Sequence, residues 1–239
     1  MNSRHTAARA LRLGLALASV ALLAGCGNIT RLHVKDDSST NLSARVLHRL
    51  GSGPGGSGLQ FDYSNTRARS EQQIGAFETA TLGSQSINGP ALLRHSVRVE
   101  SVQLLYNHLL FPGRAVEMEW FAGAAWVKTS WQSVSANPTD PRLSNLARWY
   151  GPAGGVLGRV RLASALALEL RYGGAVDLSG HGDDGWRSST ELALAFKPVP
   201  VLALRAGVVE TRTEQRPGFL STELSVRARG PFLSLGLEF

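Results

Sequence analysis

The chain has 239 residues with 25 basic and 18 acidic side chains, a formal net charge of +7 and a single cysteine, Cys26. The excess falls by three without residues 1–25, which contain Arg4, Arg9 and Arg12 and no acid. The remaining charge is too mild and too evenly spread for a nucleic-acid partner. One cysteine excludes an internal disulfide, and the length fits one domain of ordinary size.

The N-terminus has the three parts of an export signal. Arg4, Arg9 and Arg12 form a cationic region, an apolar stretch runs from Leu13 to Leu23, and small residues follow it. About 11 apolar residues cannot form a membrane-spanning helix, which needs about 20. We therefore expect residues 1–25 to be a signal peptide.

The residues at the end of this signal, Leu23-Ala24-Gly25-Cys26, resemble the lipobox of bacterial lipoproteins. The resemblance implies cleavage before Cys26 and acylation of Cys26. Gly27 follows instead of the aspartate that retains lipoproteins at the inner membrane, so the resemblance points to a lipid anchor in the outer membrane. The alternative is an ordinary signal peptide in which the place of Cys26 is accidental.

Residues 26–58 are expected to form the lipidated N-terminus and a flexible tether, because the chain from Asn28 to Thr40 is mostly polar. The stretch GSGPGGSG at 51–58 formally matches the dinucleotide-binding fingerprint. That fingerprint needs a helix directly after it, whereas a strand-like LQFDY follows here. A flexible hairpin loop or linker is the better interpretation.

Beyond residue 58 the dominant pattern has a period of two. Residues 115–127, AVEMEWFAGAAWV, place Met118, Trp120 and Trp126 on one face and Glu117 and Glu119 on the other. Similar alternation recurs at 97–106, 155–162, 166–178, 191–196, 201–208 and 220–226. The pattern predicts an all-β domain over residues 59–239.

Charged residues occupy the second face in strand after strand, which is typical of a small outer-membrane barrel with lipid outside and a polar, charged lumen. We predict a lumen charge network of Arg98, Glu100, Glu117, Glu119, Arg159, Arg161, Glu169 and Arg171. The same face carries Arg205, Glu223, Arg227 and Glu238. Trp120 and Trp126 lie about 20 Å apart along the strand, compatible with aromatic girdles. A soluble, lipid-tethered β-sandwich or lipocalin-like barrel is the alternative.

The C-terminal stretch FLSLGLEF alternates apolar and small or polar residues and ends at Phe239. It resembles the terminal assembly signal of bacterial outer-membrane barrels. The resemblance implies two partners, outer-membrane lipids and the β-barrel insertion machinery.

The fold class expected is an all-β, small antiparallel transmembrane β-barrel with eight strands favoured and ten possible. Eight strands require 219–239 to be one bent strand through Gly230-Pro231, whereas a turn there requires an extra strand near 42–50. Short turns are expected at 111–114, 162–164 and 197–200, and longer loops at 70–93, 132–148, 179–187 and 212–218.

Catalytic, metal-binding and cofactor-binding signals are weak, and no such residue is predicted. The six histidines show no metal-ligand spacing, and the loop around His181 fits a glycine-rich turn better than a cation site. The His-x-Ser pattern of the lipid A deacylases, which resemble this chain in size, is missing, as is a Gly-x-Ser-x-Gly elbow.

The expected function is a structural or interaction role of a lipid-anchored barrel in the outer membrane of a Gram-negative bacterium, with loops exposed at the cell surface. The alternatives are a barrel-type lipid-modifying enzyme and a lipoprotein component of an envelope export complex.

Overall fold

The computed structural model describes residues 30–50, 56–82, 85–111, 115–136, 142–178, 184–216 and 222–239. These form twelve strands: β1 Thr30–Asp36, β2 Thr40–Leu50, β3 Ser57–Ile74, β4 Thr79–Leu82, β5 Gln85–Asn88, β6 Ala91–Leu109, β7 Val116–Ser135, β8 Arg142–Ala163, β9 Leu166–Val176, β10 Asp184–Val199, β11 Leu202–Arg216 and β12 Thr222–Glu238. Within these ranges, no helix is both long enough and apolar enough to cross a membrane.

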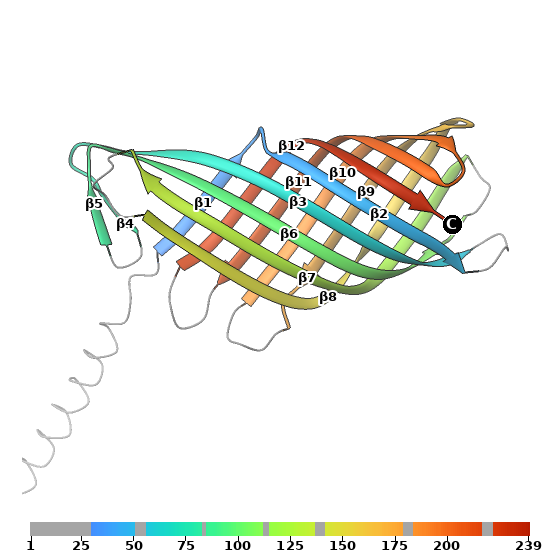
Figure 1. Cartoon of the computed structure of the whole chain (residues 1–239), viewed down its shortest axis with the longest axis horizontal. Coiled ribbons are helices and arrows are strands. Elements are labelled where there is room, and N and C mark those ends of the chain that lie inside the picture. Colours follow the sequence, from blue (N-terminus) through green and yellow to red (C-terminus); the bar gives the residue numbers. More distant parts are fainter. Residues whose placement is uncertain are drawn as a thin grey trace, which may run out of the picture.

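The long strands close into a tilted barrel (Figure 1). The sheet order is β1-β12-β11-β10-β9-β8-β7-β6-β3-β2, and the further pairing of β12 with β2 closes nine strands, with β1 as an additional strand. Neighbours are antiparallel except at the closure, where β12 pairs in parallel with both β1 and β2. The all-β barrel predicted from the sequence is confirmed at this level.

Neither eight nor ten strands is confirmed for the closed barrel, which has nine strands; with β1 the whole sheet has ten. The eight strands counted from about Leu59 are present as β3 and β6 to β12, but β2 lies inside the expected tether and adds a ninth. The prediction assumed that β12 must close on an antiparallel neighbour, which requires an even number. Parallel closure with β2 removes that requirement. The sheet therefore begins at Thr30 and the closed barrel at Thr40, instead of at residue 59.

The bent strand predicted through Gly230-Pro231 is confirmed, and it explains why the N-terminal strand is interrupted. β1 pairs with β12 as far as Ala228 and β2 resumes at Phe232. Pro231 has no amide hydrogen to give to the ladder, and a Cβ on Gly230 would lie 2.0 Å from the carbonyl oxygen of Ser39. The chain turns close to β12 at this point, where the Ser39 N–H donates to the Arg229 carbonyl at 3.1 Å.

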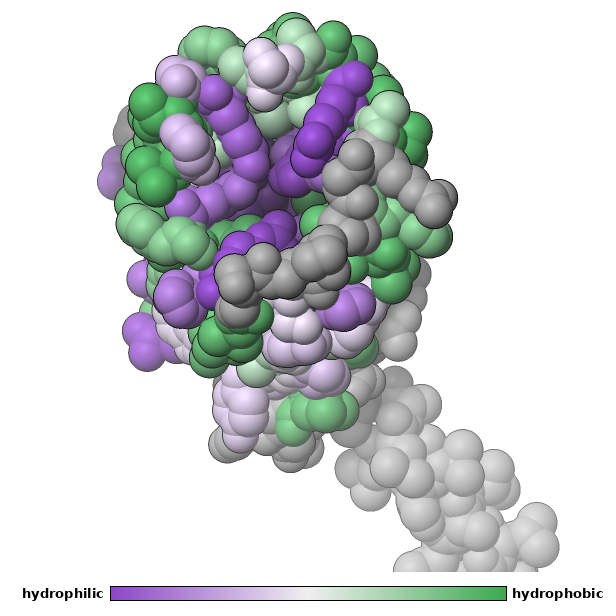
Figure 2. All heavy atoms as spheres, turned by 90° about the vertical axis from the view of Figure 1, so that its right-hand side faces the viewer, coloured by the Kyte–Doolittle hydropathy of each residue, from purple (hydrophilic) through white to green (hydrophobic). Residues whose placement is uncertain are grey.

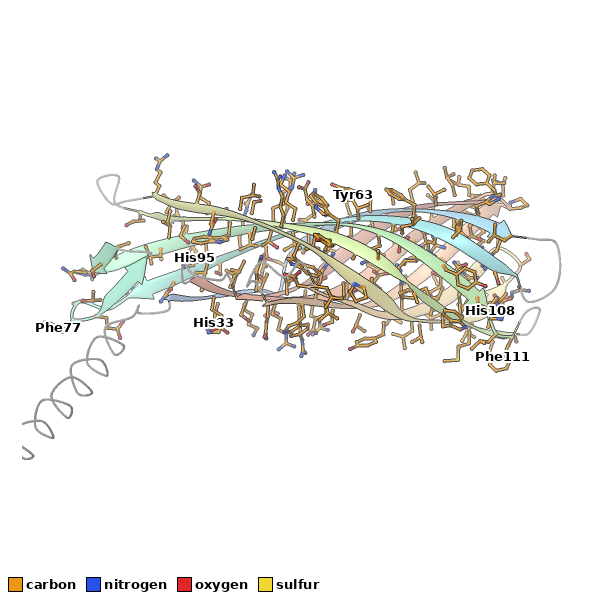
Figure 3. The ribbon with its side chains drawn as sticks, turned by 90° about the horizontal axis from the view of Figure 1, so that it is seen from below. His33, Tyr63, Phe77, His95, His108 and Phe111 are labelled. Carbon is orange, nitrogen blue, oxygen red and sulfur yellow. The ribbon has the colours of Figure 1, made fainter. Side chains whose placement is uncertain are left out.

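The two ends of the barrel differ. The near end is defined by Phe239 and by the turns at 164–165 and 200–201. The far end carries the small β4-β5 hairpin between β3 and β6. Figure 3 places Phe77 at the far end and Phe111 at the near end. The short turns predicted at 162–164 and 197–200 therefore lie together with Phe239.

The loops at the far end are shorter than predicted because the strands continue into them. β7 extends to Ser135, β8 starts at Arg142 and β11 reaches Arg216, inside segments expected to be polar loops. Residues 137–141 and 217–221 lie outside the described part. The sequence did not predict these strand segments because the kind of side chain on the inward and outward faces changes along each strand.

Strand β7 shows this change. Its outward side chains are apolar from Val116 to Trp126, whereas Lys128 and Gln132 farther on are polar. Its inward side chains begin with the buried acids Glu117 and Glu119 and continue with uncharged ones, mostly apolar residues and small hydroxyl residues. In the near half the outer wall is thus apolar and the interior charged, and in the far half the order is reversed.

Two surfaces follow from this reversal. The outer apolar band covers the near half and includes Leu42, Val46, Leu59, Phe61, Leu104, Tyr106, Val116, Met118, Trp120, Trp126, Val156, Val160, Leu168, Leu170, Leu192, Leu194, Phe196, Leu204, Val208, Leu233, Leu235 and Leu237. The inner apolar core fills the far half and includes Leu32, Val34, Ala68, Val97, Val99, Val127, Trp131, Trp149, Leu224, Val226 and Ala228.

Candidate functional site

The candidate site is the charged interior of the near half. Seen from the near end, the barrel is hollowed, and hydrophilic side chains line the hollow (Figure 2). Alternation along each strand sends every second side chain inward, so these charges come from many strands of the barrel. The inner apolar core lies beyond them in the far half.

The first group of the interior network is centred on Glu169, whose residue surface is only 3% exposed. Its two carboxylate oxygens each accept a hydrogen bond of 2.8 Å, one from Arg159 Nε and one from Arg205 Nε. Arg159 also reaches Glu117 at 3.3 Å, and Arg161 pairs with Glu117 from the rim. Three arginines and two glutamates from four strands therefore form one connected set of ion pairs across the lumen.

The group continues toward the near end through Glu238. Its carboxylate accepts hydrogen bonds from Arg205 Nη2 at 3.1 Å and from Lys197 Nζ at 2.5 Å. Gly236 makes room for this arrangement, because a Cβ there would lie 2.3 Å from Arg205 Nη1. The glycine in the terminal stretch thus has a packing role inside the barrel.

The second group lies around Asp62 on β3. Arg171 Nη2 donates to Asp62 Oδ2 at 2.6 Å, and Arg45 Nε donates to Asp62 Oδ1 at 3.3 Å. Arg45 also lies 3.7 Å from Glu191, and the Arg171 guanidinium sits 4.3 Å from the ring centroid of Phe121. Such paired and stacked guanidiniums satisfy the requirement that buried charges have partners.

A third group involves Glu119. Arg49 Nη2 donates to Glu119 Oε2 at 3.1 Å and Asn107 Nδ2 donates to Glu119 Oε1 at 3.0 Å. Asn107 also donates to Gln60 at 3.1 Å. The interior network as a whole consists of Arg45, Arg49, Asp62, Glu117, Glu119, Arg159, Arg161, Glu169, Arg171, Glu191, Lys197, Arg205 and Glu238.

Six of the eight predicted network residues point inward: Glu117, Glu119, Arg159, Arg161, Glu169 and Arg171. The prediction is wrong for Arg98 and Glu100, which pair with each other at 2.6 Å on the outer wall, where Lys128 joins them at 3.3 Å. They belong to the part of β6 where Val97 and Val99 point inward.

The same reversal affects another charged residue of the predicted lumen face. Arg227 lies outside and donates to Glu210 at 3.0 Å. The sequence did not identify Arg45, Arg49, Asp62, Glu191 or Lys197. The signal that could have found Arg45 and Arg49 is the alternation in β2 itself, in a segment expected to be a tether.

Aromatic side chains are part of the outer apolar band and also lie at its far border. Toward the near end the rings of Tyr106 and Trp120 pack with centroids 5.7 Å apart. Toward the far half the exposed aromatics are Trp126, Tyr150, Tyr172 and Trp186. On β7 the band runs from Val116 to Trp126, so Trp126 lies at its far border whereas Trp120 lies near its middle, and the predicted placement of these two residues in opposite girdles stays a prediction.

Two serine-histidine contacts occur in the described residues. His95 Nδ1 lies 2.7 Å from Ser133 Oγ, with Gln72 as its second partner at 3.3 Å. Both members are buried in the far half, and burial lowers the pKa of His95. Ser133 is completely buried and His95 is 3% exposed, so no substrate reaches this pair, and its hydrogen bonds contribute to packing in the far half.

The second contact lies on the outer wall near Phe239. Ser57 Oγ is 3.1 Å from His108 Nδ1 and accepts a hydrogen bond of 2.6 Å from the Tyr106 hydroxyl. No group of three or more potential metal ligands is found among the described residues. Cys26 and His181 lie outside the described residues, so their predicted roles stay predictions.

No family model, curated protein or solved structure matches this chain.

Proposed function

We propose that this chain is a small β-barrel lipoprotein of the outer membrane of a Gram-negative bacterium, with a structural or interaction role at the cell surface. The observation that carries the proposal is the outer apolar band over a charged interior. An apolar wall is favourable against lipid, and a closed barrel leaves no strand edge in the hydrocarbon region.

The height of the band supports the proposal. From Val116 to Trp126 the outward residues of β7 are apolar. These ten residue steps span about 33 Å along the strand at about 3.3 Å each. At a tilt of about 45° this corresponds to about 23 Å across the barrel wall, close to the roughly 25 Å apolar band of outer-membrane barrels.

The far half of the barrel supports an interaction role. Its outer wall carries exposed charges, including Arg67, Arg69, Arg94, Arg98 and Arg212, and its interior is packed with apolar residues as in a water-soluble domain. Short turns face the periplasm in this class of barrel. The far half, with the β4-β5 hairpin, would then project from the cell surface and present its charged wall to partners.

Parallel closure has a consequence for the two ends of the chain. Thr30 pairs with Thr222 and Leu47 with Glu238, so the start of β1 lies at the far end and Phe239 at the near end. If Phe239 serves as the assembly signal from the periplasmic side, Cys26, four residues before Thr30, would lie on the surface side of the membrane. The proposal is therefore a surface lipoprotein.

Fractionation and gel mobility test membrane insertion. A closed barrel in detergent should migrate differently before and after boiling, because its backbone hydrogen bonds are satisfied internally. Cys26→Ser should abolish labelling with a fatty-acid analogue, while the exported and processed chain stays in the outer-membrane fraction. A folded Cys26→Ser protein that is soluble in the periplasm and shows no heat-dependent shift would refute the barrel proposal.

Thiol labelling tests the orientation. Phe77 is fully exposed at the far end and Ser164 lies in a near-end turn. On intact cells a membrane-impermeant maleimide should label Phe77→Cys but not Ser164→Cys, and permeabilisation should expose both. The parent chain is the matched control, since acylated Cys26 has no free thiol. The opposite labelling order would mean that the far half faces the periplasm.

A second candidate function, a lipid-modifying enzyme, is favoured by one contact. Ser57 and His108 form an outward-facing pair at the near border of the band, where a lipid ester could approach. A fluorophosphonate probe should then label the protein and fail to label Ser57→Ala. Equal labelling of the two, or none, would remove this candidate.

A further inference from the structure

The interior contains a cavity at the boundary between the charged network and the inner apolar core. It has a volume of about 50 Å³ and is lined by Arg45, Asp62, Ser64, Phe121, Arg171, Arg187, Glu191 and Thr211, among others. One water needs roughly 10–15 Å³ on the same measure, so the cavity could hold several waters or one small ion.

Arg187 on β10 is the unusual group of this cavity. It is 6% exposed, and only its Nη2 has a partner in the described residues, the Ser64 hydroxyl oxygen at 3.2 Å. Its Nε and Nη1 are buried and make no hydrogen bond. A buried guanidinium with two unsatisfied donors is costly, and it calls for a missing partner.

The neighbouring acids are already engaged. Asp62 accepts hydrogen bonds from Arg45 and Arg171, and the carboxylate of Glu191 lies 3.7 Å from Arg45. Three arginines and two acids line the cavity, which leaves one positive charge without a counter-charge. A small anion would supply it.

Further unsatisfied polar groups lie beside Arg187 on the inner wall. Thr213 is its direct cross-strand neighbour, and Gln215 pairs with Gly185 one inward step away. The Thr213 hydroxyl and both polar atoms of the Gln215 amide are buried without a partner, as is Trp149 Nε1, which would lie 3.1 Å from a Cβ on Gly185. These unsatisfied groups lie on the same side of the lumen as Arg187 but do not line the cavity itself.

We propose that this cavity is a binding site for a small oxyanion, of the class of inorganic phosphate or a phosphate monoester, held by the free edge of the Arg187 guanidinium. Nε and one Nη on that edge form a planar fork that matches two oxygens of such an anion. The hydroxyl groups of Ser64 and Thr211 line the same cavity and supply neutral donors. The proposal is independent of whether the outer band faces lipid.

The test uses the full chain refolded in detergent and inorganic phosphate as the probe. Calorimetric titrations and urea unfolding are compared with chloride at the same ionic strength and pH. We expect saturable binding of one phosphate per chain and a rise of the unfolding midpoint with phosphate, because a ligand that binds only the folded state stabilises it. If the parent chain shows no saturable binding of phosphate, the proposal is overturned.

Arg187→Met separates a binding role from a packing role. Without phosphate it should be at least as stable as the parent chain, since an unsatisfied buried charge has been removed. With saturating phosphate it should be the less stable of the two, because only the parent chain gains from binding. A variant that is less stable to the same extent in both buffers would show a purely structural role and refute the site.

Two more variants complete the test. Arg212→Met removes an exposed arginine from the outer wall of the neighbouring strand and should bind phosphate like the parent chain. Should Arg187→Met fail to fold, Arg187→Lys keeps the charge but loses the planar fork, and it should bind at least tenfold more weakly. Unchanged affinity in Arg187→Lys, or an equal loss in Arg212→Met, would contradict the assignment to Arg187.

Discussion

An arginine scan along the outer face of β7 tests the reversal of polarity on which the functional proposal rests. Ala122 lies in the middle of the outer apolar band, and Gln132 points outward from the same strand in the far half. Both are exposed, so neither substitution disturbs internal packing. Only the surroundings of the new charge differ.

The expected difference follows from the geometry. Ala122 lies near the middle of the stretch from Val116 to Trp126, so Ala122→Arg should destabilise the inserted barrel by about 2–4 kcal/mol. Gln132 lies six residues beyond Trp126, which is about 20 Å along the strand and about 14 Å outside the band at a tilt of about 45°. Gln132→Arg should therefore change the stability by less than about 0.5 kcal/mol.

The assay is a urea titration of folding into phospholipid vesicles, followed by tryptophan fluorescence. Ala122→Leu is the matched control for size, and it should be neutral or slightly stabilising because it adds apolar surface to a lipid-facing position. Equal stabilities for Ala122→Arg and Gln132→Arg would refute the band. A larger loss for Gln132→Arg would mean that the far half is the embedded one.

The remaining predictions concern the interior network and use the same titration. Glu169→Gln should cost about 3 kcal/mol because two buried guanidiniums lose their shared counter-charge, whereas Glu100→Gln on the outer wall should cost less than about 1 kcal/mol; comparable losses would place Glu169 in water. Gly236→Val should destabilise by about 1–3 kcal/mol because the new side chain meets Arg205, whereas a Cβ on Gly158 would lie 4.0 Å from the carbonyl oxygen of Leu170, so Gly158→Ala should be tolerated. Equal effects of the two glycine substitutions would contradict the packing role of Gly236.

The sequence predicted the near half well because two signals coincide there. A strand such as β9 alternates Leu168 and Leu170 with Glu169 and Arg171, so both its conformation and its inward face can be read from one pattern. The charges then had to meet, since a narrow barrel brings inward side chains of many strands together. Which carboxylate meets which guanidinium could not be predicted, because that depends on register between strands distant in sequence.

The far half could not be predicted in the same way, because alternation alone does not say which face is inside. Around Arg98 the chain alternates charged and apolar residues as it does around Glu169, yet the apolar residues there point inward. Only the surroundings decide, and they change from an apolar outer wall to a polar one along the same strands. The prediction applied one rule to the whole length of each strand and so placed Arg98 and Glu100 inside.

Strand β2 and Arg187 are two further features that the sequence pattern alone did not predict. The segment from Thr40 to Leu50 alternates in sequence, with Leu42 and Val46 on one face and Arg45 on the other, but the prediction uses a strand near 42–50 only in the ten-stranded alternative, which places the short turns outside. Arg187 lies in the stretch WRSST, where Trp186 is the one apolar residue and no alternation marks a face. Its importance comes from an absence of partners, and that property exists only once the neighbouring strands are in place. A residue that the sequence gives no reason to single out therefore becomes, in the folded barrel, the strongest candidate for binding an anion.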